Sequence, residues 1–124
     1  MRKKEDKKRI LIVDDDPAIL DALRIVLEME GYEVITLSST DKIYKEVRSR
    51  KPSLILLDIW LPGGIDGTEV TRFIKAQEDL SHISVILISA VSNIRKMFKN
   101  SHADDFLAKP FDIDDVIEKA NKYL

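Results

Sequence analysis

Hydrophobic residues follow two patterns along the chain, and the alternation of these patterns predicts strands and helices in turn. Short apolar runs rich in β-branched residues are typical of strands. Apolar residues spaced three and four positions apart indicate one face of an amphipathic helix. Five strands are expected, namely RILIVD (9–14), YEVITL (32–37), SLILLDIW (53–60), ISVILISA (83–90) and DFLAKP (105–110).

A helix is predicted after each strand, and several boundary residues support this assignment. Asp16 is a favourable N-cap and Pro17 a favourable first residue for the first helix, which Gly31 ends. Pro52 ends the second helix, and Asp112 is expected to cap the last one. The apolar faces are formed by Ile19, Leu23, Val26 and Leu27, by Ile43 and Val47, by Val70, Phe73 and Ile74, by Ile94, Met97 and Phe98, and by Val116, Ile117, Ala120 and Leu124.

Strand and helix thus alternate five times, which predicts an α/β fold, a single-domain doubly wound (βα)5 sandwich. Continuous apolar strands between amphipathic helices indicate a five-stranded parallel sheet that is covered on both faces. The domain is expected over residues 8–124, after a basic N-terminal tail of residues 1–7 that is solvated.

Composition excludes several classes of protein. A chain of 124 residues fits one domain, and the absence of cysteine excludes disulfides, thiolate metal sites and a cysteine nucleophile. No apolar run approaches the roughly 20 residues of a membrane span, and the N-terminus lacks the apolar stretch of a secretory signal. A net charge of −2 gives no nucleic-acid signature. We therefore expect a cytoplasmic protein that binds neither membranes nor nucleic acid directly.

Polar side chains gather where four of the expected strands end. Ligands of open parallel sheets bind at the carboxyl ends of the strands. The residues that reach this edge are Asp14 and Asp15 after the first strand, Asp58 in the third, Ser89 in the fourth and Lys109 in the fifth. Three carboxylates, one hydroxyl and one ammonium should therefore converge on one site.

This combination of groups favours phosphoryl chemistry. Clustered carboxylates repel one another unless a cation lies among them, and oxygen ligands without His or Cys select Mg²⁺, Mn²⁺ or Ca²⁺. A lysine and a hydroxyl beside such a metal fit the oxygens of an incoming phosphoryl group. An aspartate can then act as the nucleophile and form an aspartyl phosphate.

The motifs ILIVDDDP, LILLDIWLPGGIDG, VILISA and ADDFLAKPF resemble those of the receiver domain of two-component response regulators, over residues 8–124. The resemblance implies the flavodoxin-like strand order 2-1-3-4-5. It also implies Mg²⁺ as the cofactor, held by Asp14, Asp15, Asp58 and the backbone carbonyl of Trp60. Asp58 matches the phosphoacceptor.

The remaining matches concern the phosphoryl contacts and the conformational switch. Ser89 and Lys109 match the hydroxyl and the lysine that contact the phosphoryl group, and the Lys109–Pro110 bond is expected to be cis. Ser89 and Phe106 match the pair that switches on phosphorylation. Trp60 and Val91 match the positions that flank the approach of hydrolytic water, which implies slow self-dephosphorylation.

The resemblance also implies partners. A histidine kinase or a phosphotransfer protein would donate the phosphoryl group, and conformational switching would signal to a downstream protein. A phosphorylation-dependent dimer is a further expectation. Apart from its own phosphorylation and dephosphorylation, no catalytic output is expected.

Two other functions fit part of the pattern. In an aspartyl phosphatase of the haloacid dehalogenase type, Asp14 would be the nucleophile and Asp16 the acid/base. That class needs a late acidic pair at the carboxyl end of a strand, whereas Asp104 and Asp105 precede the fifth strand's apolar residues, and it leaves Asp58 unused. The other alternative is a pseudo-receiver, a binding module that is never phosphorylated.

Each candidate also has a purely structural interpretation. The acidic run 14–16 can be a cap and a turn, with Asp16 as the cap. Taken alone, Asp58 can begin a turn, Lys109–Pro110 can be a strand exit, and Ser89 and Phe106 can be core residues. His82 and His102 lack paired ligand spacing and are interpreted as surface residues.

Two segments depart from the receiver pattern. PGGIDG carries one residue more than expected, with Gly63 and Gly64 adjacent. The segment 90–103 is about two residues short by comparison with the family, so the fourth helix should be short or distorted. Receivers commonly use the face formed by the fourth helix, fifth strand and fifth helix for dimers or partners, so this departure bears on output.

Overall fold

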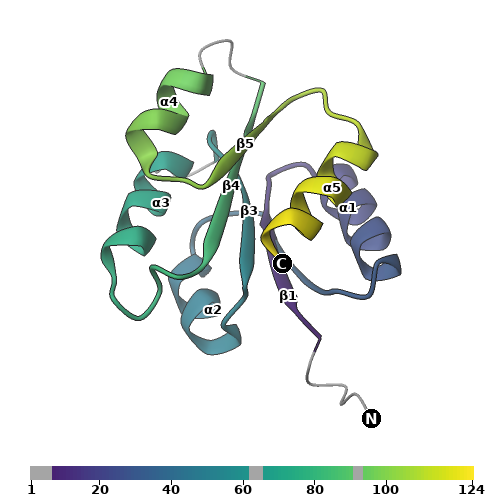
Figure 1. Cartoon of the computed structure of the whole chain (residues 1–124), viewed down its shortest axis with the longest axis horizontal. Coiled ribbons are helices and arrows are strands. Elements are labelled where there is room, and N and C mark those ends of the chain that lie inside the picture. Colours follow the sequence, from purple (N-terminus) through teal and green to yellow (C-terminus); the bar gives the residue numbers. More distant parts are fainter. Residues whose placement is uncertain (1–6, 62–65, 91–93) are drawn as a thin grey trace.

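Five strands alternate with five helices in the computed structural model, which describes residues 7–61, 66–90 and 94–124 (Figure 1). The elements are β1 (Arg9–Val13), α1 (Pro17–Met29), β2 (Glu33–Leu37), α2 (Ile43–Arg50), β3 (Leu54–Asp58), α3 (Gly67–Ala76), β4 (Ser84–Ser89), α4 (Ile94–Ser101), β5 (Asp105–Ala108) and α5 (Ile113–Tyr123). The predictions for residues 1–6, Gly63, Gly64 and Val91 lie outside the described residues.

The five strands form one parallel sheet in the order β2-β1-β3-β4-β5, which confirms the expected fold. The strands are up to three residues shorter than predicted, and the largest overestimate was the third, expected over 53–60. The strand ends at Asp58, although the N–H of Ile59 still donates to the carbonyl of Ile88 on β4 at 3.0 Å, and Trp60 then pairs with Asp66 in an isolated antiparallel bridge. The fifth strand likewise ends at Ala108 rather than at Pro110.

The first helix begins as predicted. The side chain of Asp16 accepts a hydrogen bond of 2.9 Å from the backbone N–H of Ala18, and Pro17 is the first helical residue. Gly31 follows the helix with φ +97°, a conformation that glycine adopts without strain. The cap predicted for the last helix is only partly right. Within the described residues, the side chain of Asp112 makes no capping hydrogen bond, although it stands at the N-cap position.

The predicted shortness of the fourth helix stays a prediction, because the structure describes this helix only from Ile94 onward. The described part of α4 spans 8 residues, Ile94–Ser101, and residues 91–93 before it lie outside the described residues. Among the described residues, no helix is long and apolar enough to cross a membrane.

Two hydrophobic layers enclose the sheet. α1 and α5 cover one face, and α2, α3 and α4 cover the other (Figure 1). Alternate residues of β1 show the division, because Ile10 and Ile12 pack with the first layer and Leu11 and Val13 with the second. Because all of these side chains are fully buried, the sheet is a rigid platform for the polar residues at its carboxyl edge.

Candidate functional site

Three carboxylates meet at the carboxyl edge of the sheet. Asp14 and Asp15 follow β1 and Asp58 ends β3, and one carboxylate oxygen of each lies within 4.8 Å of those of the other two. Asp14 and Asp58 are only 1% and 6% exposed, whereas Asp15 is exposed. The sequence therefore identified the cluster correctly, because apolar strands carry these acidic residues to neighbouring positions.

Lys109 reaches this cluster from the end of β5. Its ammonium lies 2.9 Å from Oδ2 of Asp14 and 3.1 Å from Oδ2 of Asp58. Its backbone N–H donates to the carbonyl of Ser89, at 2.9 Å, which continues the pairing of β5 with β4. The Lys109–Pro110 bond is cis, as expected.

The proton affinities of these groups reflect burial and their mutual contacts. Burial raises the pKa of Asp58 above its usual value, and the nearby charge of Asp14 adds to this, against the opposing effect of Lys109. Burial alone would lower the pKa of Lys109, but its hydrogen bonds to Asp14 and Asp58 raise it. Lys109 thus remains a cation, and its charge offsets part of the effect that burial has on the pKa of Asp58.

The two buried carboxylates are held at both oxygens. The backbone N–H of Asp16 donates to Oδ1 of Asp14 at 2.9 Å, and that of Trp60 donates to Oδ1 of Asp58 at 3.2 Å. The other oxygen of each carboxylate faces Lys109. Asp58 is therefore oriented before any ligand arrives, which favours reaction at a defined geometry.

The donor set fits a hard divalent cation. Three carboxylates and one ammonium leave two negative charges, and all the candidate ligand atoms are oxygens. Asp14, Asp15 and Asp58 are the side chains that would hold Mg²⁺, which needs few protein ligands because it keeps several waters.

Gly67 is a positioning residue that sequence reasoning missed. A Cβ atom at Gly67 would lie 2.5 Å from the backbone oxygen of Asp58 and 3.0 Å from Cα of Ile59. Its N–H donates to the carbonyl of Ile59 at 2.7 Å, so α3 starts directly against the end of β3. The only sequence signal was a glycine next to the N-cap residue Asp66.

The candidate switch residues lie on the strands beside the acidic cluster. Ser89, the last residue of β4, is 1% exposed. Phe106 is half-buried in β5, where its ring lies 5.2 Å from that of Phe98 and the guanidinium of Arg95 lies 5.6 Å from its centroid. The sequence placed Phe98 on the apolar face of this helix, whereas Arg95 had no recognisable role.

The remaining candidates lie away from the cluster or at its rim. Trp60, next to Asp58, is 55% exposed. Asp104 and Asp105 stand at the amino end of β5, opposite the site, where the N–H of Asp104 donates to the carbonyl of Val85 at 2.9 Å. This removes the acidic pair that a haloacid dehalogenase-type phosphatase needs. His82 and His102 are exposed, as expected.

Comparison with known proteins extends this description. The family model of the response regulator receiver domain matches residues 10–121. The DNA-binding dual master transcriptional regulator RpaA of Synechocystis is 37% identical over 118 residues, which cover 94% of this chain and 48% of RpaA. The chain spans less than half the length of the curated relatives it matches.

Solved structures of response regulators and receiver domains are also similar to this chain. The response regulator TrrA of Thermotoga maritima, in complex with Mg²⁺ and BeF, aligns with a TM-score of 0.82 at 36% identity, covering 94% of this chain and 99% of that one. A CheY-like receiver domain protein of Methanospirillum hungatei aligns with a TM-score of 0.83 at 34% identity, covering 94% and 93%.

Proposed function

The chain belongs to the response regulator receiver domain family of two-component signalling, and from this premise we propose that it accepts a phosphoryl group on Asp58. The observation that carries the proposal is the setting of this carboxylate. Asp58 is buried and oriented by the N–H of Trp60, and it shares Lys109 with Asp14 within the acidic cluster. The N–H of Trp60, Lys109 and Asp14 would thus each have a function if Asp58 is the phosphoacceptor.

In the proposed reaction, a carboxylate oxygen of Asp58 attacks the phosphorus atom of a phosphohistidine. An oxygen–phosphorus bond forms, the nitrogen–phosphorus bond breaks, and the electron pair leaves with the imidazole. The ammonium of Lys109 exchanges a carboxylate for a phosphoryl oxygen, and the hydroxyl of Ser89 donates to another. Mg²⁺, when held by Asp14, Asp15, Asp58 and the carbonyl of Trp60, supplies further charge neutralisation of the phosphoryl oxygens.

Phosphorylation then changes the positions of Ser89 and Phe106. Contact with the phosphoryl group draws Ser89 toward Asp58, and Phe106 rotates into the space that Ser89 leaves. Because a phenylalanine has no hydroxyl to satisfy, its burial costs less than that of a tyrosine. The two arrangements are therefore close in energy, and the phosphoryl group shifts their populations.

The surface beside Lys109 suits the docking of a protein donor, which we propose to be a histidine kinase or a phosphotransfer protein. A hollow of about 420 Å³ borders Lys109 and is lined otherwise by Ile19, Ala90, Pro110 and Phe111. Exposed apolar side chains next to a reactive group favour a protein partner over a small donor alone.

The output of the proposed switch is contact with another protein, including a second copy of this chain in a phosphorylation-dependent dimer. RpaA is a DNA-binding regulator, but this chain matches 48% of it and carries a net charge of −2, which does not favour nucleic acid. The proposed location is the cytoplasm, because kinases of this kind draw their phosphoryl groups from ATP there.

Incubation with acetyl phosphate and Mg²⁺, followed by intact-mass measurement, tests the proposal. The wild-type protein should gain one phosphoryl group, and Asp58→Asn should gain none. Asp16→Ala should still be labelled, because Asp16 is an exposed cap, and should lose roughly 1 kcal/mol of stability.

The outcomes separate the three candidate functions. Labelling that persists in Asp58→Asn but is lost in Asp14→Asn would identify Asp14 as the nucleophile, as in the phosphatase alternative. A wild-type protein that binds Mg²⁺ but is never labelled would be a pseudo-receiver.

A further inference from the structure

α4 contacts the candidate switch residue Phe106 through two side chains. The ring of Phe98 lies 5.2 Å from that of Phe106 at an interplanar angle of 47°, a tilted aromatic contact. The guanidinium of Arg95 lies 5.6 Å from the centroid of Phe106, within the range of a cation–π interaction. Both contacts come from the same face of the helix, and both depend on the orientation of one ring.

The surroundings of Arg95 favour a cation at this position. Arg95 and Phe106 border a hollow of about 520 Å³ that is also lined by Asp105, Asp112 and Asp115. These acidic residues of β5 and of the start of α5 make the surroundings of Arg95 negative, although the carboxylate of Asp105 is already paired with Lys119 at 3.0 Å. The placement of Arg95 over Phe106 therefore rests on geometry and on charge together.

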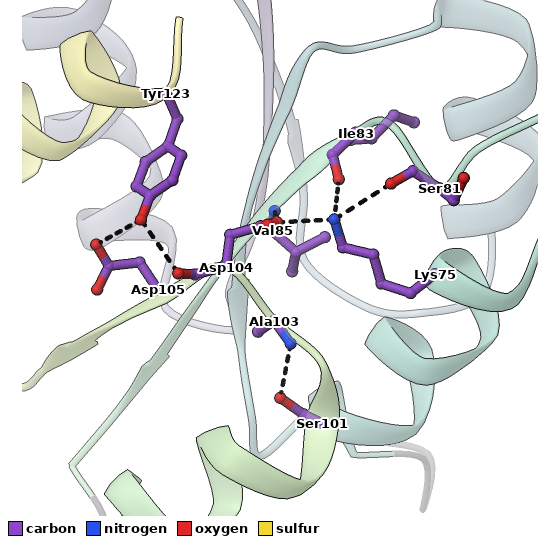
Figure 2. Close-up of polar contacts among 9 residues, drawn as sticks. All are labelled: Lys75, Ser81, Ile83, Val85, Ser101, Ala103, Asp104, Asp105 and Tyr123. Carbon is purple, nitrogen blue, oxygen red and sulfur yellow. Dashed lines mark hydrogen bonds and ion pairs between the residues drawn. The ribbon is translucent and has the colours of Figure 1, made fainter.

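The carboxyl end of α4 is fixed by polar contacts. Ser101 is fully buried, and its hydroxyl donates to the carbonyl of Phe98 at 2.7 Å. The same oxygen accepts from the N–H of Ala103 at 3.1 Å, which ties the helix end to the approach to β5 (Figure 2). His102, between them, has φ 68°, which sharply turns the chain out of the helix.

A second cluster holds the segment after Ala103 against β4 and α3. The ammonium of Lys75 on α3 lies 2.8 Å from Oδ2 of Asp104 and donates to the carbonyl of Ile83 at 2.7 Å. Oδ2 of Asp104 also accepts from the N–H of Val85 at 2.8 Å (Figure 2). The carboxyl end of α4 is thus held by polar contacts and Ile94 in its first turn is buried in the core, while Arg95 and Phe98 are the side chains of this helix that contact the ring of Phe106.

We infer that Arg95 is a positioning residue of the switch, which holds Phe106 in the orientation that accompanies the pairing of Lys109 with Asp14 and Asp58. Rotation of the Phe106 ring away from α4 breaks the contact with Arg95. The contact therefore stabilises the arrangement seen here against the phosphorylated one. A ligand that selects the other arrangement must overcome this preference, so its apparent affinity is reduced by the same factor.

The inference rests on the proposed function, because it uses Phe106 as the switch of a phosphate-accepting site. The test is a titration of the full chain with beryllofluoride in saturating Mg²⁺, followed by calorimetry and by NMR of the Phe106 ring. Arg95→Gln should bind beryllofluoride about two- to fivefold more tightly than the wild type, the factor that an exposed cation–π contact represents. Arg95→Lys, which keeps a cation, should return toward the wild-type affinity.

Lys96→Gln is the matched control. It removes the same charge from an adjacent exposed position of α4, so it reports any effect of net charge on an anionic ligand. Its affinity should equal or fall slightly below that of the wild type. Equal affinities of Arg95→Gln and Lys96→Gln, or weaker binding by Arg95→Gln, would overturn the role of Arg95. Failure of the wild type to bind beryllofluoride at all would instead overturn the proposed function.

Discussion

Lys109 is the residue that makes the acidic cluster compatible with a folded protein. Asp14 is almost completely buried, and a buried carboxylate without a partner is strongly unfavourable. The ammonium of Lys109 contacts both Asp14 and Asp58, so one cation compensates two carboxylates. The same pairing competes with Mg²⁺ for these oxygens, which links the stability of the protein to metal binding.

Replacement of Lys109 should therefore destabilise the protein in a way that Mg²⁺ can correct. Lys109→Met leaves two buried carboxylates facing each other, and we expect a loss of about 3 kcal/mol in the free energy of unfolding without metal. A ligand that binds only the folded state restores stability in proportion to its occupancy. Urea titrations with and without Mg²⁺ should show a larger gain in Lys109→Met than in the wild type.

Lys119→Met serves as the control for that experiment. It removes an ammonium 3.0 Å from Asp105, remote from the acidic cluster. Its response to Mg²⁺ should match that of the wild type. An equal gain in Lys109→Met and Lys119→Met would show that Lys109 does not compete for the metal ligands.

Trp60 should report metal binding through its fluorescence. The indole is 55% exposed, and the peptide N–H of Trp60 donates to Asp58, so a divalent charge at the cluster lies close to it. Emission should change saturably and with weak affinity, because the site provides few protein ligands. Asp15→Asn should abolish the change, whereas Asp16→Asn, which removes a neighbouring charge but keeps a cap, should retain it. A flat titration of a folded protein that binds Mg²⁺ by another method would place Trp60 away from the metal.

The convergence of the acidic cluster and Lys109 was predictable from the sequence because Asp14, Asp58 and Lys109 each end or follow an apolar run. Asp58 and Lys109 occupy the ends of strands whose hydrophobicity is unmistakable, and parallel strands bring their carboxyl ends to one edge. Gly67 and Arg95 could not be found in this way. Their importance comes from one close backbone approach and one ring contact, and both depend on distances between elements.

Among the elements, the joint between β3 and α3 carries a strict steric demand at Gly67. The chain leaves the sheet after Asp58 and returns so closely that Gly67 touches the peptide of the candidate acceptor. The strand was predicted to continue to Trp60, and this was wrong because the apolar residues continue past the point at which the backbone turns. Hydrophobic periodicity identifies elements well, but their ends depend on such contacts.

Gly67→Ala should impair both stability and labelling. The new methyl group would meet a backbone oxygen at 2.5 Å, and a backbone atom cannot move aside as a flexible side chain can. We expect a loss of about 1–3 kcal/mol, as for other overpacked sites, together with slower phosphorylation by acetyl phosphate because Asp58 is displaced.

Gly31→Ala is the matched control for that glycine. Gly31 has φ +97°, but a methyl group added there would meet no atom within 4 Å, so its replacement costs backbone strain of about 1–2 kcal/mol without touching the site. Labelling of Gly31→Ala should proceed at the wild-type rate. Wild-type labelling by Gly67→Ala as well would show that the close approach does not position Asp58.

Over the whole molecule, polar contacts at the amino edge of the sheet join the last helix to the rest of the fold. The hydroxyl of Tyr123 lies 3.0 Å from Oδ2 of Asp105 and 3.1 Å from the carbonyl oxygen of Asp104, so its one proton is shared between the two acceptors, and Lys119 pairs with the same carboxylate of Asp105 (Figure 2 shows the Tyr123 contacts). This edge lies opposite the acidic cluster, so the molecule separates a reactive edge from a stabilising one. Sequence patterns did not predict this network, because its members are ordinary surface residue types.

Titration of Tyr123 should make the stability of the whole molecule depend on alkaline pH. Burial, the hydrogen bond to Asp105 and the charges of Asp105 and Asp104 raise the pKa of Tyr123 to about 12. A group whose pKa is higher in the folded state contributes stability that is complete below its unfolded pKa of about 10 and is lost above it. The contribution of Tyr123 should thus decline between about pH 10 and about pH 12.

Urea unfolding of the wild type and of Tyr123→Phe at several pH values measures this contribution. At pH 8 the variant should be less stable by about 1–2 kcal/mol, because the hydrogen bond that the phenol shares between a carboxylate and a carbonyl oxygen is lost. The difference should shrink as the pH rises toward 12, since deprotonation of Tyr123 removes the same hydrogen bond from the wild type. Phenolate absorbance should lose its highest titration step in Tyr123→Phe but keep it in Tyr44→Phe, where burial and the charge of Glu69 raise the pKa of the replaced tyrosine. A stability difference that is constant with pH would mean that the phenol of Tyr123 does not bind the carbonyl oxygen of Asp104 or the carboxylate of Asp105 in solution, and that α5 is held to the sheet by its apolar face and by Lys119.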